Sequence, residues 1–312
     1  MIRRILLPSV PIALALSTGL ALAVLPVGTA HAADTNCPSA EGSYAGGTGT
    51  IGDPFLVSTP GPLQRLRDQS ADWSKAVRLT ADIDMGSGGT DCIWRTTLGN
   101  PSIANWTGTF EGDGHVVSGL DIEVTGRFAG FFAYLGNNAV VRDFGFTGDV
   151  RATATGLSTV QVGAGALAGW TLSSQIERSF TTGDVTVNIS AAAAVFTGSA
   201  TANPIVGGLV GTSQGTVTNS YATGNVNVTA SAAAMNPGTA VVNTAVGGLL
   251  GSAQASSSIV TYSYSTGSIT TSPSAVGGTG QTITERIGGS IGEFSTQYAS
   301  ATGVVWDTTA SG

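Results

Sequence analysis

The chain has 312 residues, of which 10% are charged and 45 are glycine, and its formal net charge is −7. Nucleic acids and anionic lipid surfaces are excluded as expected partners, because both require clustered Lys and Arg and Lys75 is the single lysine. Val, Ile and Leu recur with a short period along the chain, which indicates a folded protein and not a disordered one.

Residues 1–32 have the form of a secretory signal. Arg3 and Arg4 precede an apolar stretch, residues 5–27, that ends in the small-x-small sequence Ala30-His31-Ala32. We therefore expect export and cleavage after Ala32, with an uncleaved membrane anchor as the alternative. After cleavage no membrane-spanning segment is expected, and the mature chain is predicted to be secreted or extracellular, with association to a cell surface left open.

The two cysteines, Cys37 and Cys92, are predicted to form a disulfide in an oxidising compartment. The bond would tie the mature N-terminus to the first coils, and two separate thiols are the alternative. A zinc site is excluded for these two residues alone, because structural zinc uses four ligands and His115 is the only histidine after the signal.

Residues 33–75 are predicted to form an N-terminal cap with a first strand. Phe55-Leu56-Val57 indicates the strand, and the prolines at 60 and 62 lead into a short amphipathic helix over residues 63–68. The open hydrophobic end of a stacked repeat protein needs a cover, and this helix is placed to provide it.

Residues 76–125 are predicted to form the first coils. The stretch 77–84 alternates as a strand does. In residues 106–122, Phe110 closes one strand, Glu111-Gly112-Asp113-Gly114 is a turn signal, and Val116 starts the next strand. Strands are therefore short and corners frequent.

From residue 126 to residue 312 the chain repeats itself. The five units lie near 128–150, 162–185, 205–226, 246–269 and 287–306, and equivalent positions are 36, 42, 40 and 41 residues apart. This spacing is typical of stacked repeat architectures. No amphipathic run long enough for a helical repeat follows residue 75, so we predict an all-β, right-handed parallel β-helix with a short N-terminal capping helix.

Within a unit, residues 207–211 predict an apolar strand between glycines, residues 216–221 a second strand, and Thr223-Gly224-Asn225 a turn before a third. We expect about 20 residues per coil, hence two coils per unit and a rise of about 45–50 Å over five units. The Ala/Thr/Ser-rich stretches at 190–203 and 230–244 are expected to be strand extensions with protruding loops, which often collect on the binding face.

These units resemble the GLUG-motif repeats of secreted and surface-exposed bacterial proteins. Gly207-Gly208-Leu209-Val210-Gly211 followed by residues 219–226 is the best copy, and residues 246–269 are nearly as good. Residues 106–122 look like the coil that commonly precedes such repeats, and residues 305–312 are similar to the element that follows them. The resemblance implies adhesin-like or haemagglutinin-like β-helices and some IgA-protease-type passengers; it says little about activity.

Carboxylates that could serve chemistry lie mainly before residue 150. Asp82 and Asp84 are two apart, so on a strand both would point the same way and could hold Ca²⁺; the alternative is that both cap turns or face solvent. His115 could act as a general base with Asp113 or Glu111, and the alternative is a corner histidine bonded to backbone. No other cofactor is expected.

Aromatic side chains are the candidate platforms for stacking on sugars, with internal packing as the favoured alternative. They are Trp73, Trp94, Trp106, Trp170 and Trp306, with Tyr44, Tyr134, Tyr221, Tyr262 and Tyr264.

The favoured hypothesis is a secreted, non-enzymatic, adhesin-like protein that binds an extracellular glycan, a matrix component or a partner cell. The alternative is a pectin-lyase-like polysaccharide lyase or hydrolase with its site near residues 82–123. A third hypothesis, structural or ice-binding, rests on Thr ladders, but the Thr pairs are not in constant register. Self-association at the C-terminal end, or its closure by a packed Trp306, is also predicted.

Overall fold

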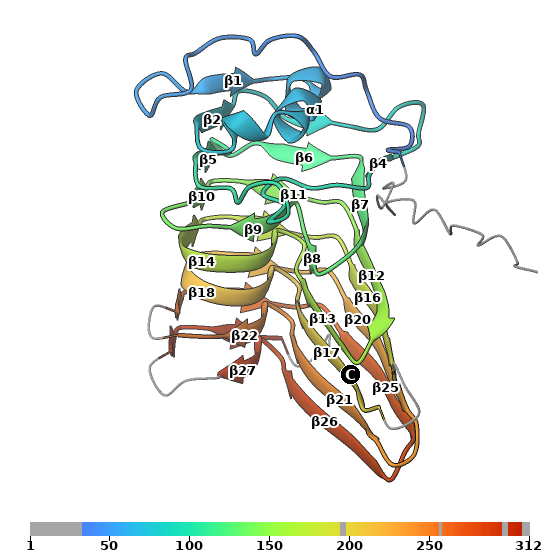
Figure 1. Ribbon diagram of the computed structural model, residues 1–312. Coiled ribbons are helices and arrows are strands. Elements are labelled where there is room, and N and C mark those ends of the chain that lie inside the picture. The colour runs from blue at the N-terminus through green and yellow to red at the C-terminus, as the bar shows by residue number, and fades with distance from the viewer. Residues whose placement is uncertain (1–32, 194–197, 256–257, 295–298, 308–312) are drawn as a thin grey trace, which may run out of the picture. The chain divides into compact units, whose positions relative to one another are not determined.

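The computed structural model describes residues 33–193, 198–255, 258–294 and 299–307. The predicted signal, 1–32, and residues 308–312 of the predicted C-terminal element lie outside the described residues. The described chain winds through four β-sheets (Figure 1). The pairs between the named strands are parallel. The prediction of an all-β parallel β-helix is confirmed.

Successive coils meet the sheets in the same order, and we number the sheets by that order. The first sheet contains β1 (Phe55–Val57), β2 (Ala76–Leu79), β5 (Thr109–Glu111), β9 (Phe132–Leu135), β10 (Val140–Arg142), β14 (Ala168–Glu177), β18 (Val210–Thr218), β22 (Leu250–Ala253), β23 (Ile259–Thr261), β27 (Ile291–Phe294) and β28 (Ser300–Thr302). The second contains β3 (Ile83–Asp84), β6 (Val116–Ser118), β11 (Gly145–Phe146), β15 (Phe180–Thr181), β19 (Tyr221–Ala222), β24 (Tyr264–Ser265) and β29 (Val305–Trp306).

The third and fourth sheets contain strands of six to nine residues in the later coils. The third contains β4 (Cys92–Trp94), β7 (Leu120–Thr125), β12 (Val150–Leu157), β16 (Val185–Ala192), β20 (Val226–Ala234) and β25 (Ile269–Gly277). The fourth contains β8 (Phe128–Ala129), β13 (Thr159–Ala164), β17 (Ala200–Gly207), β21 (Thr239–Gly247) and β26 (Gly280–Gly288).

Each repeat unit forms one complete coil and not two. Val210 in β18 pairs with Leu250 in β22, and Leu250 pairs with Ile291 in β27, so partners in adjacent coils lie one full repeat apart. The prediction of about 20 residues per coil is wrong. The Ala/Thr/Ser-rich stretches supply the strands of the third and fourth sheets. These strands double the number of residues in each coil. Five coils therefore rise about 24 Å at about 4.8 Å per layer.

The predicted strand at residues 207–211 is a corner between the fourth and first sheets. β17 ends at Gly207 and β18 begins at Val210, with Leu209 buried between them. A Cβ atom on Gly208 would lie 2.2 Å from the carbonyl oxygen of Gly248 in the next coil. Glycine is required here because the two backbones approach so closely, which is the role predicted for it.

The corner between the first and second sheets holds one residue in the left-handed backbone region in successive coils. These residues are Asp143 (φ 53°), Arg178 (φ 45°), Asn219 (φ 51°) and Tyr262 (φ 49°). A buried serine follows in three coils. The Ser220 hydroxyl donates to the Thr218 carbonyl (2.9 Å), and the Ser220 N–H donates to the Ser263 hydroxyl oxygen (3.2 Å). The serines thus satisfy backbone groups that the sharp corner leaves unpaired.

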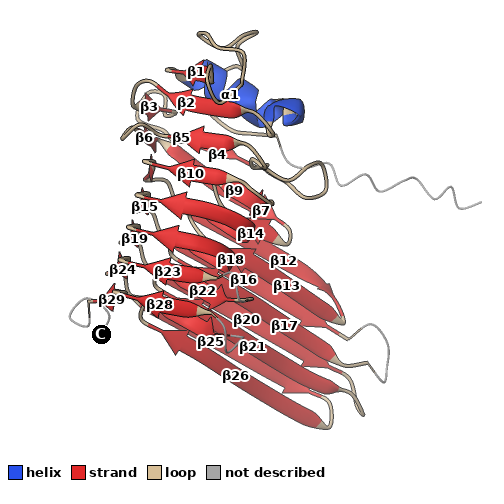
Figure 2. Cartoon of the chain, turned by 90° about the vertical axis from the view of Figure 1, so that its left-hand side faces the viewer, coloured by secondary structure: helices blue, strands red, loops and turns tan. Residues whose placement is uncertain are grey.

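Beyond the first two sheets, the third and fourth extend together as a double layer, which we call the arm: β12, β13, β16, β17, β20, β21, β25 and β26 (Figure 2). Ala230 and Ala232 of β20 and Ala240 and Val242 of β21 are at most 1% exposed. Such small side chains let two sheets pack closely. The prediction that the Ala/Thr/Ser-rich stretches are strand extensions is confirmed.

The N-terminal end of the stack is covered by α1 (Pro60–Asp68), which is followed by the short helix η1 (Ser70–Asp72). Leu63 and Leu66 of α1 are completely buried in the core, so the predicted capping helix is confirmed. The predicted disulfide between Cys37 and Cys92 is also present. It holds the first described residues against β4.

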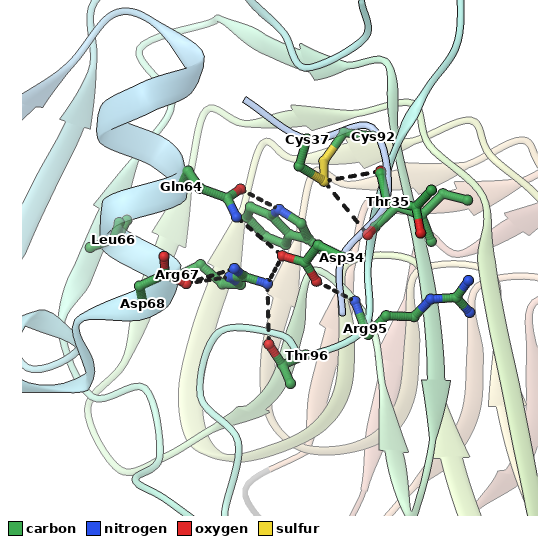
Figure 3. Close-up of polar contacts among 12 residues, drawn as sticks. Asp34, Thr35, Cys37, Gln64, Leu66, Arg67, Asp68, Cys92, Arg95 and Thr96 are labelled. Carbon is green, nitrogen blue, oxygen red and sulfur yellow. Dashed lines mark hydrogen bonds and ion pairs between the residues drawn. A yellow bond between two sulfur atoms is a disulfide. The ribbon is translucent and has the colours of Figure 1, made fainter. Parts of the chain in front are cut away.

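A polar network fastens this cap to the segment that precedes it (Figure 3). The Asp34 carboxylate forms an ion pair with Arg67 of α1 and accepts hydrogen bonds from the Gln64 side chain (3.1 Å) and the Arg95 N–H (2.9 Å). The Trp94 indole N–H donates to the Gln64 amide oxygen (2.8 Å). The Asp34 carboxylate, the Gln64 amide and the Trp94 indole N–H therefore all have hydrogen-bond partners, as burial requires.

Candidate functional site

The predicted catalytic histidine lies on the surface beside an unexpected partner. His115 Nδ1 is 3.1 Å from Asp82 Oδ1, and the same oxygen accepts the N–H of Val116 (3.0 Å). The Val116 N–H and the His115 ring hold the pKa of Asp82 below its usual range. Asp82 is thus a hydrogen-bond acceptor that fastens β3 to the start of β6, and its side chain is 76% exposed.

The other predicted site carboxylates do not join this pair. Asp84 Oδ1 accepts the N–H of Gly86 (2.9 Å), so Asp82 and Asp84 bond separate backbone groups. Asp113 has φ 53° in the turn after β5, and Glu111 pairs with Arg78 (2.9 Å) and Arg142 (3.2 Å). Among the described residues, no group of three or more His, Cys, Asp or Glu side chains is arranged to hold a metal ion.

Several of the predicted sugar-stacking rings pack internally, whereas Tyr262, Tyr264 and Trp306 are 67%, 40% and 38% exposed. Trp73, Trp94 and Trp106 are at most 2% exposed. On the second sheet Tyr221 stacks between Phe180 and Tyr264, with ring centroids 5.0 and 4.8 Å apart. Their stacked faces contact one another, so a sugar could reach only ring edges in the middle of this column.

A groove forms where the arm lengthens from one coil to the next. β7 pairs with β12 only over Val150–Thr153, and β8 pairs with β13 only at Gly163 and Ala164. The outer halves of β12 and β13 therefore project past the coil before them. Three hollows of about 310, 230 and 480 Å³ lie at this step and share Arg95, Val124, Thr125, Gly126 and Arg127 among them. We call them together the step groove.

The arginines of the step groove differ in their partners. Arg95 pairs with Glu123 (2.5 Å), and Arg151 pairs with Asp121 (2.9 Å) and Asp149 (2.8 Å). The hydrogen bond that Arg151 donates to the Asp121 carboxylate, together with the other nearby carboxylates, raises the pKa of Arg151.

Arg127 is held without a carboxylate. It donates to the Gln161 amide oxygen (2.7 Å), and its guanidinium carbon lies 5.3 Å from the centroid of the Phe128 ring. No ion pair of Arg127 occurs among the residues that the structure covers. It is therefore the cation of the groove that is available to an anionic group.

The outer face of the third sheet continues from the groove as a grid of short polar side chains, which we call the polar array. Its rows, aligned by strand pairing, are Thr186–Asn227–Thr270, Thr153–Asn188–Thr229–Ser272 and Thr155–Ser190–Ser231–Ser274. Most of these side chains are exposed. Neighbouring residues within a row lie about 4.8 Å apart, from one strand to the next, so the array presents hydroxyl and amide groups at a regular spacing.

Sequence reasoning missed both the step groove and the polar array. The Thr pairs are not in constant register, as predicted, but Asn and Ser occupy the remaining positions of the same rows. The signal that was available is the alternation in residues 185–190 and 226–231, where every second residue is small and polar. Alternation reveals a two-faced strand, but only strand pairing shows which residues share a row.

The fold and its surface define the class of protein: a parallel β-helix repeat protein with a lateral double-layered arm. Residues 202–229 match the family described as "The GLUG motif". They cover the return strand β17, the Gly-Gly-Leu corner, β18, β19 and the start of β20. This segment therefore carries a GLUG motif, and the resemblance noted in the sequence is confirmed there.

Two relatives share this pattern over part of their length. Halomucin from Haloquadratum walsbyi is 32% identical over 176 residues, which is 54% of this chain but 2% of the relative. A putative Gly-rich membrane protein from Evansella cellulosilytica is 30% identical over 112 residues, or 34% of this chain and 12% of the relative. The chain thus spans a small fraction of either relative.

A solved structure, that of a putative immunoglobulin A1 protease from Bacteroides ovatus, covers 81% of this chain and 87% of its own. Its TM-score is 0.39 and its sequence identity is 17%. The fold assignment depends on the strand pairing of this chain and not on that likeness. Within the described residues, no helix is long and apolar enough to cross a membrane.

Proposed function

We propose that this chain is an extracellular, non-enzymatic, adhesin-like repeat protein that binds a glycan along the polar array and the step groove. The signal pattern in residues 1–32 and the names of the relatives, a halomucin and a membrane protein, support an extracellular or cell-surface location. The observation that carries the binding role is the register of the polar array.

The chemistry of the array suits a hydroxyl-rich polymer. Short Thr, Ser and Asn side chains lose little rotational entropy when they form hydrogen bonds, compared with Lys, Arg or Glu. Each can both donate and accept, and a regular spacing allows many weak contacts with a repeating ligand. Such contacts sum to a high avidity without a deep pocket.

Arg127 gives the site a preference among glycans. Its guanidinium is free of carboxylates and borders two of the hollows of the step groove. An arginine binds carboxylate and sulfate groups through paired N–H donors. A polysaccharide with acidic substituents therefore fits the array and the groove together.

The experiment is a glycan binding array with the secreted chain and a paired set of variants. Asn188→Glu with Thr229→Glu removes an amide and a hydroxyl from the array and places two carboxylates there, which repel an acidic polymer, so binding should weaken at least about tenfold. Thr201→Glu, on the outer face of the fourth sheet, is the matched control and should bind as the parent does. Arg127→Gln should weaken binding of acidic glycans only. Equal binding by all variants would refute the site.

The enzymatic alternative is tested in the same preparation. The exposed Asp82–His115 pair is the arrangement that a pectin-lyase-like activity could use. A panel of polysaccharides is incubated with the chain and assayed for new reducing ends and unsaturated products, and we expect none. Turnover that is abolished by Asp82→Ala or Asp113→Ala would overturn the binding role.

A further inference from the structure

The two ends of the coil stack differ in how their interior is covered. At the N-terminal end, α1 buries Leu63 and Leu66 completely. At the other end, Ile283 and Ile287 of β26 are 47% and 51% exposed, although their partners Val242 and Val246 in β21 are 0% exposed. The inward-facing side chains of β21 therefore lie in the core, whereas the equivalent side chains of β26 lie at the surface.

The exposed row is broad. In β25, Pro273 and Ala275 continue the inward row of Ala230 and Ala232, which are 1% exposed, yet both are partly exposed. Trp306 covers part of this end, since a Cβ atom on Gly289 would overlap its ring. It remains 38% exposed and lies in the second sheet, away from the arm. The predicted closure by Trp306 thus leaves the end of the arm uncovered by the described residues.

We propose that the C-terminal end of the arm is a two-fold interface between two copies of this chain. A fitting cover must present two strands of nine residues, back to back and running in opposite directions, because β25 and β26 each have nine residues and are joined by a short turn. A second copy offers this cross-section at its own C-terminal end, whereas at the other edge of the arm β12 and β13 have eight and six residues.

Symmetry then determines the pairing. A two-fold axis along the arm places β25 of one copy on β26 of its partner. Since β25 runs toward the tip of the arm and β26 runs back, the two become antiparallel, and the same pairing is repeated on the other side. An interface of this kind is isologous and closes at the dimer. In each copy, β25 and β26 together supply nearly as many residues as each partner contributes to a typical stable interface, which is about 20 to 30.

One contact indicates which residues meet. The Thr271 hydroxyl donates to the Glu285 carboxylate across the arm (2.5 Å), so these two residues lie at about the same distance from the tip. One residue further out on each strand, Ser272 of β25 and Thr284 of β26 point to the outer faces, as the alternation along each strand requires. In the dimer, Ser272 of one copy lies opposite Thr284 of the other.

The test is sedimentation velocity on the full exported chain from about 1 to 100 μM, in which we expect a concentration-dependent dimer. Ile283→Lys with Ile287→Lys should raise the dimer Kd at least about tenfold. Both side chains are about half exposed in the single chain, so circular dichroism and the urea midpoint, measured at a concentration below the dimer Kd of the parent, should change little. Leu157→Lys, at a site that is 65% exposed on the other edge of the arm, is the control and should dimerise normally.

Cross-linking tests the orientation. A chain with Ser272→Cys and Thr284→Cys should form disulfide-linked dimers under mild oxidation, whereas Ser272→Cys alone should not. A monomer at all concentrations would overturn the proposal, as would dimers that persist in the double lysine variant. Growth beyond the dimer would indicate head-to-tail stacking and would overturn the two-fold arrangement.

Discussion

Leucine at the Gly-Gly-Leu corner provides a direct test of the one-coil repeat. Leu167, Leu209 and Leu249 occupy this corner in successive coils and are 0% exposed. The Leu209 N–H donates to the Leu249 carbonyl (2.9 Å), and the Leu167 N–H donates to the Leu209 carbonyl (3.0 Å). Leu209→Ala should therefore leave a cavity between two coils and lower the free energy of unfolding by about 3–4 kcal/mol.

The double-mutant cycle makes the test specific. Leu209 and Leu249 lie in adjacent layers, so the free-energy changes of Leu209→Ala and Leu249→Ala should differ from additivity by about 1 kcal/mol. If each repeat contained two coils, an intervening layer would separate these side chains by about 10 Å, and the changes would add within about 0.5 kcal/mol.

The assay is urea unfolding followed by circular dichroism and tryptophan fluorescence. Leu157→Ala serves as the control, because that side chain is 65% exposed and its truncation should cost less than about 0.5 kcal/mol. Additive changes in the cycle, or a loss below about 1 kcal/mol for Leu209→Ala alone, would refute the packing described here.

Two further outcomes are expected. Replacing both Cys37 and Cys92 by serine removes a link across 55 residues. In the chain-entropy account this should lower the free energy of unfolding by about 4 kcal/mol. An unchanged urea midpoint would contradict the view that the disulfide stabilises the N-terminal cap. The hydrogen bonds from Arg178 (2.6 and 2.8 Å) lower the pKa of Asp143. The stability from this pair should therefore be present above the ordinary carboxyl pKa of about 4 and be lost as the pH falls through the lower folded value. It should amount to at most about 1 kcal/mol at this exposed site, and Asp143→Asn should remove that part of the acid dependence of the urea midpoint.

The local features of the fold could be predicted from neighbouring residues. Thr223-Gly224-Asn225 indicates a corner because glycine and asparagine are typical turn residues, and the prolines before residue 63 mark the start of α1. Both inferences need only chemistry that is close in sequence. The disulfide followed from the number of cysteines and the expected compartment.

The candidate site could not be predicted in the same way. His115 was matched to Asp113 and Glu111, which are near in sequence, but its partner is Asp82, 33 residues away. The step groove exists because the arm of one coil is shorter than the arm of the next. Differences between coils appear only when strands are paired.

The amino-acid sequence by itself determined that this protein is a stack of short parallel strands with sharp corners, because alternation and turn residues act over a few positions. Only the tertiary structure decided that a coil of the repeat region passes through four sheets and contains about 40 residues, and that the arm carries an ordered polar face. The physical reason is that a repeat period has the same length whether it contains one coil or two. The number of sheets depends on which strands form hydrogen bonds with each other, and these strands are some 40 residues apart in the sequence.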